Sequence, residues 1–405
     1  MAGRLVIVGA GQAAFSLGAR LRALKDERPI TMIGSEDVLP YQRPPLSKKY
    51  LMGEMTFERL EFRPAEWFAE NDVDIRLSTW VEEIDRAAKT VRMQDGSKLS
   101  YEKLVLATGA TPRTLPAGIG GDLDGVLTVR DKRDADRLMG EMKPGRKLLV
   151  IGGGYIGLEA AAVARKAGLD VTLIEMADRI LQRVASADTA AIMRDVHRAN
   201  GVSIIEKTGL TRLNGKDGHV TSAELSDGTV LDVDFVIVGI GVTPNDRLAG
   251  DSGLDSGNGI LVDSYTRTSD PDIHAVGDCA SLPWEGGRVR LESVQNAVDQ
   301  AEAAAVVLTG EEKAYVPKPW FWSDQYDVKL QIAGYNAGYD ETMLRPGQRE
   351  GSYSIWYFRQ GKFLAVDAIN DAKAYVSGKK LLDTGREPDR TVLADASADL
   401  KLLLA

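Results

Sequence analysis

The chain has 405 residues and a formal net charge of −9, with 44% hydrophobic and 27% charged residues. That length exceeds what one hydrophobic core commonly serves, so two or three domains are expected. The acidic balance argues against general nucleic-acid binding, and no apolar run approaches the roughly 20 residues of a membrane-spanning helix. A strand-like run begins at Arg4 and leaves no room for a secretory leader, so we expect a cytoplasmic protein.

Cysteine and histidine usage narrows the chemistry further. The sequence contains one cysteine, Cys279, so a redox-active pair of cysteines within the chain is excluded. We interpret Cys279 as a small buried residue rather than a redox thiol. The three histidines, His197, His219 and His274, are scattered without metal-ligand spacing, and no metal site is expected.

The N-terminal segment predicts a strand, a glycine-rich turn and a helix. Residues 4–9 read RLVIVG, and Gly9, Gly11 and Ala14 then follow a G-x-G-x-x-A spacing at the start of an amphipathic pattern. In such a turn the backbone N–H groups can approach a pyrophosphate, and the helix N-terminus adds favourable electrostatics. The segment therefore predicts a dinucleotide-binding loop.

A second strand is predicted over residues 30–36, and it ends at Ser35 and Glu36. Glu36 is the candidate for binding an adenosine ribose, with Ser35 as a hydroxyl partner. A solvated loop glutamate is the alternative interpretation. The next segment, LPYQRPPLSKKYL at 39–51, contains two prolines that fix the backbone, and we expect Ser47 to cap a helix beginning at Lys48. Held near a flavin, Lys48 could stabilise negative charge; a solvated lysine is the alternative.

A second segment with the strand, glycine-rich turn and helix pattern occurs in the middle of the chain. The segment KLLVIGGGYIGLE places Gly152, Gly154 and Gly157 between a predicted strand and a helix whose apolar face is expected to include Ile156. The following strand ends in LIEM, where Glu175 can bind the ribose 2′-OH and repel a 2′-phosphate. This arrangement favours NADH over NADPH, although the nearby Arg179 weakens the inference.

Two residues close to this second loop have open interpretations. Tyr155 lies within the loop, where its ring could cover a flavin until a nicotinamide displaces it; a packing tyrosine is the alternative. Glu159 lies on the first helical turn, where it could pair with Lys48 or simply complement the helix dipole.

The segments at 101–113 and 232–245 share a form, an apolar run followed by Gly and then Thr-Pro, which is typical of a chain leaving one domain for another. A strand is predicted within 268–280 and a helix over 293–310. After Pro317 and Pro319, aromatic and alternating segments predict an antiparallel sheet and a third domain, and residues 389–405 are expected to be helical. Two such loops in one chain indicate two dinucleotides and electron transfer between them.

These motifs together are similar to one family. The segments that carry the resemblance span the whole chain in order: GAGQAA, LPYQRPPLSKKYL, LVLATGATPR, VIGGGYIGLE, VGIGVTPN, TSDPDIHAVGDCA, ESVQNA and PWFWSDQY. They resemble the oxygenase-coupled NADH-dependent ferredoxin reductases. The resemblance implies a glutathione-reductase-like α/β fold, with two Rossmann-type dinucleotide-binding domains plus a C-terminal α+β domain. The implied boundaries are 1–112 and 241–316 for FAD binding, 113–240 for NAD binding and 317–405 for the C-terminal domain.

The resemblance also implies an activity. One non-covalent FAD would take hydride from NADH and pass electrons singly to a [2Fe–2S] ferredoxin, which serves a cytochrome P450 or a Rieske-type dioxygenase. Lys48, Tyr155, Glu159 and Trp320 are the residues this implies at the catalytic centre. The implied cofactor-binding residues are Gly9, Gly11, Ala13, Ala14, Ser35, Glu36, Arg43, Lys48, Val81, Ala107, Thr108, Gly109, Arg130, Gly152, Gly154, Tyr155, Ile156, Gly157, Glu159, Glu175, Gly241, Gly277, Asp278, Ser293, Val294 and Trp320.

The pattern departs from the family at two places. Many relatives have an acid where this chain has Ser35, and the fifteen C-terminal residues match no motif. An acidic ferredoxin needs a local basic surface on this acidic chain. The candidates are Lys313, Lys318, Arg288, Arg290, Lys379 and Lys380, with scattered solubilising charge as the alternative.

We expect a monomer or weak homodimer, with neither nucleic acid nor membrane as a partner. The alternative functions are an NADH:rubredoxin reductase, an NADH oxidase without a catalytic cysteine, and a non-enzymatic flavoprotein of the apoptosis-inducing-factor type. The last would be expected to carry a targeting segment and a basic surface, and the sequence shows neither.

Overall fold

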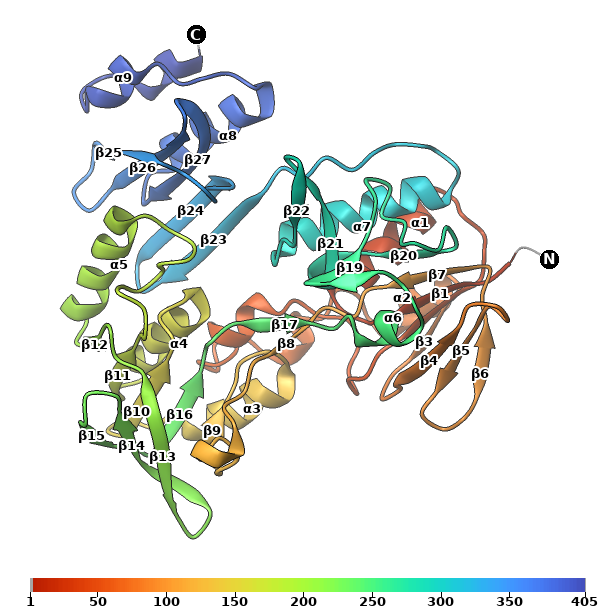
Figure 1. The fold of residues 1–405 in the computed structure, drawn as a ribbon, viewed down its shortest axis with the longest axis horizontal. Helices are drawn as coiled ribbons and strands as arrows, with labels where there is room; N and C mark the ends of the chain where they lie inside the picture. Colours follow the sequence, from red (N-terminus) through yellow and green to blue (C-terminus); the bar gives the residue numbers. More distant parts are fainter. Residues whose placement is uncertain (1–2, 405) are drawn as a thin grey trace. The chain divides into compact units, whose positions relative to one another are not determined.

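The structure is a computed structural model that describes residues 3–404. The chain forms two compact units, coloured along the sequence in Figure 1. Unit 1 comprises Met1–Gln42, Phe57–Thr111 and Val242–Pro319; unit 2 comprises Arg43–Thr56, Pro112–Gly241 and Trp320–Ala405. Residues 43–56 cluster with unit 2, although the sequence analysis assigned them to the FAD-binding domain.

Unit 1 is built on a five-stranded parallel sheet with the strand order β20-β7-β1-β2-β3. The strands are β1 (Leu5–Val8), β2 (Ile30–Ile33), β3 (Val73–Arg76), β7 (Lys103–Leu106) and β20 (Ile273–Ala275). β1 and β2 are buried along their whole length, as expected for a sheet covered on both faces. Its helices are α1 (Gln12–Ala23), α2 (Ala65–Glu70), α6 (Arg247–Asp251) and α7 (Val294–Leu308). Leu17 of α1 and Ala301 of α7 belong to the same buried cluster as Leu5 and Ile7 of β1.

Smaller sheets complete unit 1. A three-stranded antiparallel sheet contains β4 (Val81–Asp85), β5 (Thr90–Met93) and β6 (Lys98–Ser100). A four-stranded sheet contains β18 (Ser256–Gly257), β19 (Gly259–Leu261), β21 (Ala280–Trp284) and β22 (Gly287–Val289). Two short 3₁₀ helices are η2 (Phe57–Arg59) and η4 (Gly277–Cys279). The strands β8 (Ala110–Pro112) and β17 (Val242–Pro244) pair where the chain leaves and re-enters unit 1.

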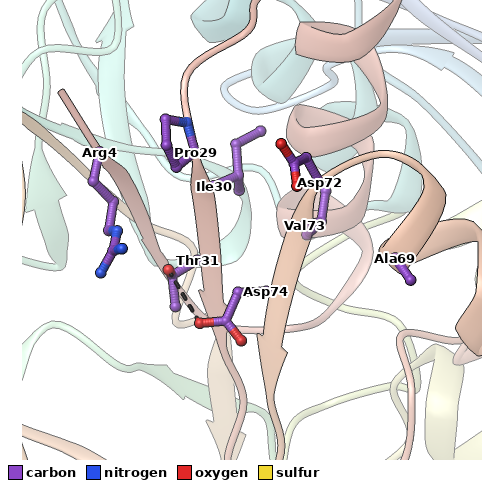
Figure 2. Close-up of a pocket in the computed structure, with 8 residues that line it drawn as sticks. All are labelled: Arg4, Pro29, Ile30, Thr31, Ala69, Asp72, Val73 and Asp74. Atoms are coloured by element: carbon purple, nitrogen blue, oxygen red, sulfur yellow. Dashed lines mark hydrogen bonds between the residues drawn. The ribbon is translucent and has the colours of Figure 1, made fainter. Parts of the chain in front are cut away.

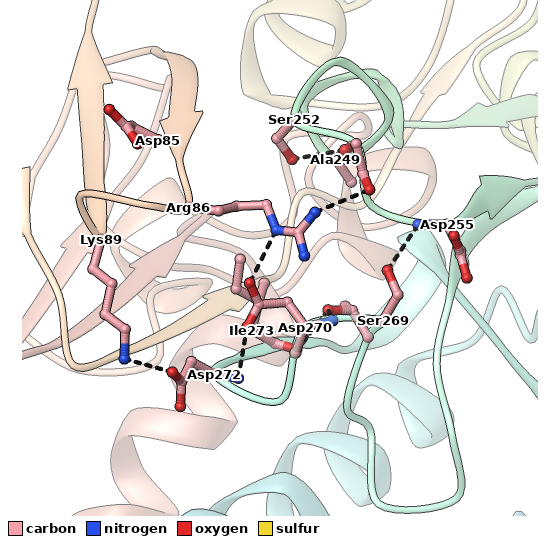
Figure 3. Close-up of polar contacts among 12 residues, drawn as sticks. Asp85, Arg86, Lys89, Ala249, Ser252, Asp255, Ser269, Asp270, Asp272 and Ile273 are labelled. Carbon is pink, nitrogen blue, oxygen red and sulfur yellow. Dashed lines mark hydrogen bonds and ion pairs between the residues drawn. The ribbon is translucent and has the colours of Figure 1, made fainter.

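Ion pairs join the β4–β5 hairpin to the loop before β20, as Figure 3 shows. The Nε of Arg86 lies 2.9 Å from Asp270, and its Nη1 donates to the carbonyl of Gly253 at 3.1 Å. Lys89 pairs with Asp272 at 2.5 Å. Because these side chains are partly exposed, the pairs contribute little to stability and mainly fix the position of the hairpin.

Unit 2 contains a second five-stranded parallel sheet, with the order β12-β11-β10-β16-β9. Its strands are β9 (Val126–Leu127), β10 (Lys147–Ile151), β11 (Asp170–Ile174), β12 (Ser203–Ile205) and β16 (Phe235–Val238). The helices of this part are α3 (Lys132–Glu141), α4 (Tyr155–Lys166) and α5 (Ala187–Ala199), with the 3₁₀ helices η1 (Pro44–Ser47) and η3 (Ala117–Ile119). A small antiparallel sheet contains β13 (Leu210–Lys216), β14 (His219–Leu225) and β15 (Val230–Asp232).

The C-terminal part of unit 2 is the antiparallel sheet that the sequence predicts, with the order β23-β24-β27-β26-β25. Its strands are β23 (Trp320–Gln325), β24 (Val328–Gly334), β25 (Glu341–Pro346), β26 (Tyr353–Arg359) and β27 (Lys362–Ile369). The helices α8 (Ala372–Thr384) and α9 (Arg390–Ala394) and the 3₁₀ helix η5 (Leu400–Leu404) follow, so the expected helical tail is confirmed. One buried cluster runs from Leu158 of α4 to Leu330 of β24, which joins the two sheets of unit 2.

Two local predictions are wrong. No α-helix begins at Lys48; residues 44–47 form η1 instead, and Lys48 ends it with φ −138° and ψ −113°. Consecutive prolines remove two backbone donors, which suits a short 3₁₀ turn better than a helix that must continue. Ile156 is 44% exposed rather than part of the apolar face of α4, because the buried residues of that helix begin at Gly157.

Candidate nucleotide-binding loops and the Glu159 cluster

The first candidate site lies at the carboxyl end of β1, in unit 1. Gly9 has φ +120°, and a Cβ there would lie 2.2 Å from the carbonyl oxygen of Ala107, so only glycine fits. Gly11 caps α1, and a Cβ there would meet nothing within 4 Å. Within the part of the chain that the structure describes, α1 has no side-chain hydrogen bond at its N-cap. Open space in front of uncapped backbone donors fits the pyrophosphate of a dinucleotide.

Other predicted residues of unit 1 surround this loop. Gly34 lies next to the loop, since a Cβ there would be 2.5 Å from the Cβ of Ala10. After Gly34, Ser35 is exposed and Glu36 is half-buried, and the phenol of Tyr41 donates to Glu36 Oε2 at 2.6 Å. Tyr41 therefore orients the carboxylate that the sequence assigns to the ribose.

The loop after β7 contains Ala107, Thr108 and Gly109, and Asn245 holds it from two sides. The Thr108 hydroxyl donates to the Asn245 carbonyl at 2.6 Å, and the Asn245 amide donates to the Thr108 carbonyl at 2.8 Å. The backbone N–H of Asn245 bonds to the carbonyl of Gly109 at 2.9 Å. Asn245 ends the VGIGVTPN motif, but no local sequence pattern marks it as a site residue.

The helix predicted at 293–310 begins where expected. Ser293 caps α7 by accepting a hydrogen bond from the backbone of Asn296, and Val294 is the first helical residue. Gly277 follows β20, and its N–H donates to Gln300 Oε1 of α7 at 2.8 Å in a buried contact. Gly277 also lies close to α1, because a Cβ there would be 3.1 Å from that of Ala13. The loop carrying Asp278 is thus positioned between two helices.

The structure limits what Val81 can contribute. Val81 begins β4, and its side chain is buried in an apolar cluster. Only its backbone is therefore open to a ligand, while the neighbouring Trp80 is largely exposed.

The second candidate site lies at the carboxyl end of β10, in unit 2. Gly152 has φ +105°, and a Cβ there would lie 2.4 Å from the carbonyl oxygen of Gly239. A Cβ at Gly154 would meet nothing within 4 Å, and Gly154 caps α4 without a side-chain bond. At Gly157 a Cβ would lie 2.1 Å from the carbonyl oxygen of Gly152, so the third glycine allows the helix to approach the strand. These residues also fit a dinucleotide.

Glu175 follows β11 and is attached to this loop. Its Oε2 accepts the N–H of Gly153 at 2.7 Å, and its Oε1 accepts the N–H of Ala177 at 2.8 Å. Arg179, which could have bound a 2′-phosphate, instead donates to the carbonyl oxygens of Ile180 and Ala185. Backbone N–H groups therefore orient the Glu175 carboxylate. Arg179, the cation that could have bound a 2′-phosphate, donates to carbonyl oxygens of the protein.

Tyr155 is the first residue of α4 and packs into unit 2. Its ring lies 4.9 Å from that of Phe321, and its buried hydroxyl has no hydrogen-bond partner among residues 3–404. Burial raises the pKa of this phenol well above its ordinary value. These contacts favour the packing interpretation over a mobile cover. Trp320 begins β23 half-buried, with its ring 5.6 Å from that of Trp322.

Lys48 and Glu159, both in unit 2, belong to a largely buried polar cluster that follows the second loop. The Nζ of Lys48 donates to Glu159 Oε2 at 2.7 Å, so the predicted pair is present. Ser47 donates to the same oxygen at 2.9 Å, and Ser323 of β23 donates to Oε1 at 2.7 Å. Glu159 is 5% exposed, and three donors compensate its carboxylate for the loss of water. Sequence analysis identified neither serine as part of this site.

Arg43 and Arg130 also meet in unit 2. The Nη1 of Arg43 donates to the carbonyl of Arg130 at 2.8 Å. Just after η1, the phenol of Tyr50 donates to Asp136 of α3 at 2.6 Å. These two hydrogen bonds attach residues 43–56 to α3 and to the loop before it. Gly241 ends this part of unit 2 with φ +98°.

A pocket elsewhere in unit 1 lies at the wrong end of the sheet to bind a dinucleotide. Figure 2 shows it beside Arg4, Ile30, Thr31, Val73 and Asp74, which lie at the amino ends of β1, β2 and β3. In open parallel sheets, ligands bind beyond the carboxyl ends of the strands, where Gly9 lies. The glycine loop, rather than this pocket, is the candidate site.

Residues 3–404 contain neither a candidate metal cluster nor a helix able to span a membrane. In residues 3–404, no group of three or more His, Cys, Asp or Glu side chains could hold a metal ion. Within the same residues, no helix has the length and apolar character needed to cross a membrane.

The two loops and the C-terminal sheet define a class of protein. Residues 3–301 match the family of pyridine nucleotide-disulphide oxidoreductases, and residues 320–404 match the reductase C-terminal family. The chain belongs to the pyridine nucleotide-disulphide oxidoreductase family, whose members are flavoproteins that use FAD and NAD(P)H.

Individual relatives extend this assignment over the whole chain. Rhodocoxin reductase of Rhodococcus erythropolis is 42% identical over 99% of this chain and 94% of its own length. The 5,5'-dehydrodivanillate O-demethylase ferredoxin reductase subunit of Sphingobium sp. is also 42% identical, over 99% of this chain and 98% of its own. A crystal structure of the covalent putidaredoxin reductase–putidaredoxin complex has a chain that is 38% identical, with a TM-score of 0.96 over 99% of this chain and 98% of that one. The predicted glutathione-reductase-like fold is confirmed.

Proposed function

We propose that this chain is an FAD-containing NADH:ferredoxin oxidoreductase that supplies electrons to an oxygenase system. The observation that carries the proposal is the pair of glycine loops, in which Gly11 and Gly154 each leave open space before an uncapped helix. The similarity to the reductase of an O-demethylase and to a reductase solved with its redox partner supports a ferredoxin as the acceptor. The oxygenase served is a cytochrome P450 or a Rieske-type dioxygenase.

The proposed reaction converts NADH and two oxidised ferredoxins into NAD⁺, two reduced ferredoxins and one proton. When bound, FAD accepts a hydride and releases electrons one at a time, which lets a two-electron donor serve a one-electron acceptor. The chain itself offers no dithiol for this purpose, because Cys279 is its single cysteine. Burial raises the pKa of the Cys279 thiol, which keeps it protonated and unreactive.

The residues of each unit have separate proposed roles. In unit 1, the Gly9–Gly11 loop and the N-terminus of α7 provide backbone donors for FAD, with Glu36 on the ribose. In unit 2, the loop around Gly154 binds the pyrophosphate of NADH, and Glu175 accepts from its ribose hydroxyls. The Glu175 carboxylate repels a 2′-phosphate, which favours NADH over NADPH. Lys48, held by Glu159, supplies positive charge to the redox centre.

The ferredoxin-docking surface is proposed on a helix where two of the candidate cations are exposed or partly exposed. Arg288 donates to the carbonyl oxygens of Val262 and Ser281, and Arg290 pairs with Glu292, so both have structural partners. Lys380 is exposed on α8, and Lys379 forms only a partly exposed pair with Asp383 of the same helix. We therefore favour the Lys379–Lys380 region of α8.

Several further properties belong to the proposal. The protein is a monomer or weak homodimer and binds neither nucleic acid nor membrane. It works in the cytoplasm, a reducing compartment that suits a chain with a single buried thiol.

A panel of purified redox carriers tests the function. The protein with bound FAD should reduce at least one [2Fe–2S] ferredoxin with NADH, and rubredoxin much more slowly. Lys379→Glu with Lys380→Glu should raise the KM for that ferredoxin roughly tenfold while leaving NADH-driven ferricyanide reduction intact. Protein that does not bind FAD would contradict the function, and unchanged ferredoxin kinetics would contradict the docking surface.

A further inference from the structure

Glu159 is the end point of a buried chain of hydrogen bonds within unit 2. Ser323 Oγ lies 2.7 Å from Glu159 Oε1, and Gln325 Nε2 lies 3.0 Å from Ser323 Oγ. The Oε1 of Gln325 lies 2.7 Å from Nε2 of His197 on α5. The phenol oxygen of Tyr326 lies 3.5 Å from the other ring nitrogen of His197. Ser323, Gln325 and His197 are completely buried, so the part of the series from Glu159 to His197 is shielded from solvent.

The carboxylate fixes the direction of every bond in this chain. An ionised carboxylate only accepts, so Ser323 must donate its single proton to Glu159. Gln325 must then donate from Nε2 to Ser323, which turns its Oε1 towards His197. His197 must carry its proton on Nε2 and leave Nδ1 as an acceptor. Each donor thus polarises the next towards Glu159, which strengthens the series.

The elements that carry the chain explain its geometry. Ser323 and Gln325 are two positions apart on β23, so both side chains point to the same buried face. His197 lies in the last turn of α5, and burial lowers the pKa of its imidazole, which keeps the ring neutral. The chain therefore links α5, β23 and α4 through polar groups where apolar side chains would suffice for packing.

We propose that Ser323, Gln325 and His197 are positioning residues for the reductase reaction, because they hold the Glu159 carboxylate and through it the Lys48 ammonium in one orientation. This inference rests on the proposed function. Ser47 and Lys48 occupy Oε2 of Glu159, so Ser323 is the group that fixes Oε1. Without Ser323 the carboxylate can rotate, and the Lys48 ammonium loses a fixed partner. The C-terminal sheet thereby contributes to the orientation of the Lys48 ammonium.

Nitrogen-15 NMR of the histidines tests the direction of the chain without any turnover. The sequence has three histidines, so His197→Gln and His274→Gln assign the signals. His197 should be neutral with its proton on Nε2 from about pH 6 to about pH 8. Ser323→Ala should shift this signal, since it removes the next group in the series. A charged His197 ring, or a neutral ring with its proton on Nδ1, would contradict the proposed direction of the hydrogen bonds.

Single-turnover kinetics test the positioning role. Ser323→Ala should slow the bleaching of bound FAD by NADH roughly tenfold, with the Kd for NADH within about twofold of wild type. Ser323→Thr keeps the hydroxyl and should restore most of the rate. The control is Ser354→Ala on β26, which removes an equally buried serine that accepts from Trp356 and lies outside the chain. If Ser323→Ala fails to fold, Ser323→Cys preserves volume with a weak donor and should show the same loss.

The outcomes separate the two proposals. Equal rates of FAD bleaching in Ser323→Ala and Ser354→Ala would overturn the positioning role, because the loss of any buried serine would then explain the slower reaction. A wild-type protein that binds FAD but is not bleached by NADH would contradict the proposed function instead. In that case the NMR measurement still decides whether His197, Gln325 and Ser323 form the directed chain.

Discussion

The glycine loops of the two units have the same geometry at their first two glycines and differ in the third motif position. In both, the first glycine has positive φ and lies against a backbone carbonyl of a neighbouring segment, of Ala107 for Gly9 and of Gly239 for Gly152. The second glycine faces open space in both. The third position differs, because unit 1 has Ala14, fully buried, where unit 2 has Gly157.

This difference shows that α4 lies closer to the end of β10 than α1 lies to the end of β1. A Cβ at Gly157 would lie 2.1 Å from the carbonyl oxygen of Gly152 in its own loop, whereas α1 leaves room for the methyl group of Ala14. The acids after the second strands differ as well. Glu175 accepts directly from its loop at Gly153, while Glu36 is oriented by Tyr41. The second loop is therefore the more tightly constrained of the two.

Gly157→Ala should have the largest effect on the KM for NADH. The added methyl group must displace backbone, and overpacking of this kind costs about 1–3 kcal/mol. We expect the KM for NADH to rise between about tenfold and about a hundredfold. Steady-state kinetics with ferricyanide measure the change, and flavin absorbance should show that unit 1 still binds FAD.

The matched change in unit 1 is Ala14→Gly. It removes a methyl group that α1 accommodates and should cost only the roughly 0.5–1 kcal/mol of a glycine within a helix. The KM for NADH should stay near that of wild type. If Gly157→Ala were as mild as Ala14→Gly, the inference that the two helices approach their strands differently would be wrong.

The units also differ in their buried ionisable groups. In unit 2, burial raises the pKa of Asp367 to about 6, although Tyr357 and Thr189 donate to it. In unit 1, burial, together with the positive charges of Lys103 and Arg267, lowers the pKa of His274 to about 4. The two groups titrate over the same pH range with opposite consequences for stability.

Asp367→Asn should raise stability at neutral pH. The native carboxyl binds its proton more tightly than the unfolded one, whose pKa is 3.8, so stability falls as the pH rises through about 6. The full cost is about 3 kcal/mol above that pH, and the neutral amide avoids it. Chemical denaturation at about pH 8 and about pH 4 measures the change. A variant no more stable than wild type at about pH 8 would show that the carboxylate is better compensated than its contacts suggest.

His274→Asn should protect the protein against acid. The unfolded imidazole binds protons from its ordinary pKa of 6.5 downward, while the native ring stays neutral to about 4, so stability is lost as the pH falls through this range. The variant should lose about 3 kcal/mol less between pH 7 and pH 4, while its amide can still bond to Thr266. Its pH profile should change in the opposite sense to that of Asp367→Asn. The same sense in both variants would contradict these assignments.

Local sequence patterns predicted the features that depend on residues close together in the sequence. Both glycine loops, the cap of α7 at Ser293 and the antiparallel C-terminal sheet follow from spacing, alternation and capping rules. The Lys48–Glu159 pair was one of two interpretations, and geometry was needed to choose between them.

The remainder depends on contacts between distant segments. Ser323 reaches Glu159 across 164 positions, and Ser47 reaches it across 112, so no local pattern could reveal the cluster. The sequence predicts a helix after Pro44 and Pro45 because Ser47 is a residue type that caps helices. In the structure the Ser47 hydroxyl donates to the distant carboxylate of Glu159 instead. The predicted ribose role of Glu175 and the three-domain boundaries remain predictions.

Glu175→Ala and Glu175→Gln test the difference between the two acids most directly. Removing the carboxylate should narrow the NADH/NADPH ratio of kcat/KM by roughly tenfold, since the 2′-phosphate is no longer repelled. Glu175→Gln removes the charge but retains an acceptor for Gly153 or for a ribose hydroxyl. It should admit NADPH while keeping more NADH activity than alanine does.

The corresponding change in unit 1, Glu36→Gln, distinguishes the role of this acid from that of Glu175. Because Glu36 is assigned to the ribose of FAD, this variant should weaken FAD retention and leave the NADH/NADPH ratio unchanged. A ratio preserved in Glu175→Ala would remove Glu175 from the ribose site. The hydrogen bonds from Gly153 and Ala177 would then have only a structural role, in holding the loop to the end of β11.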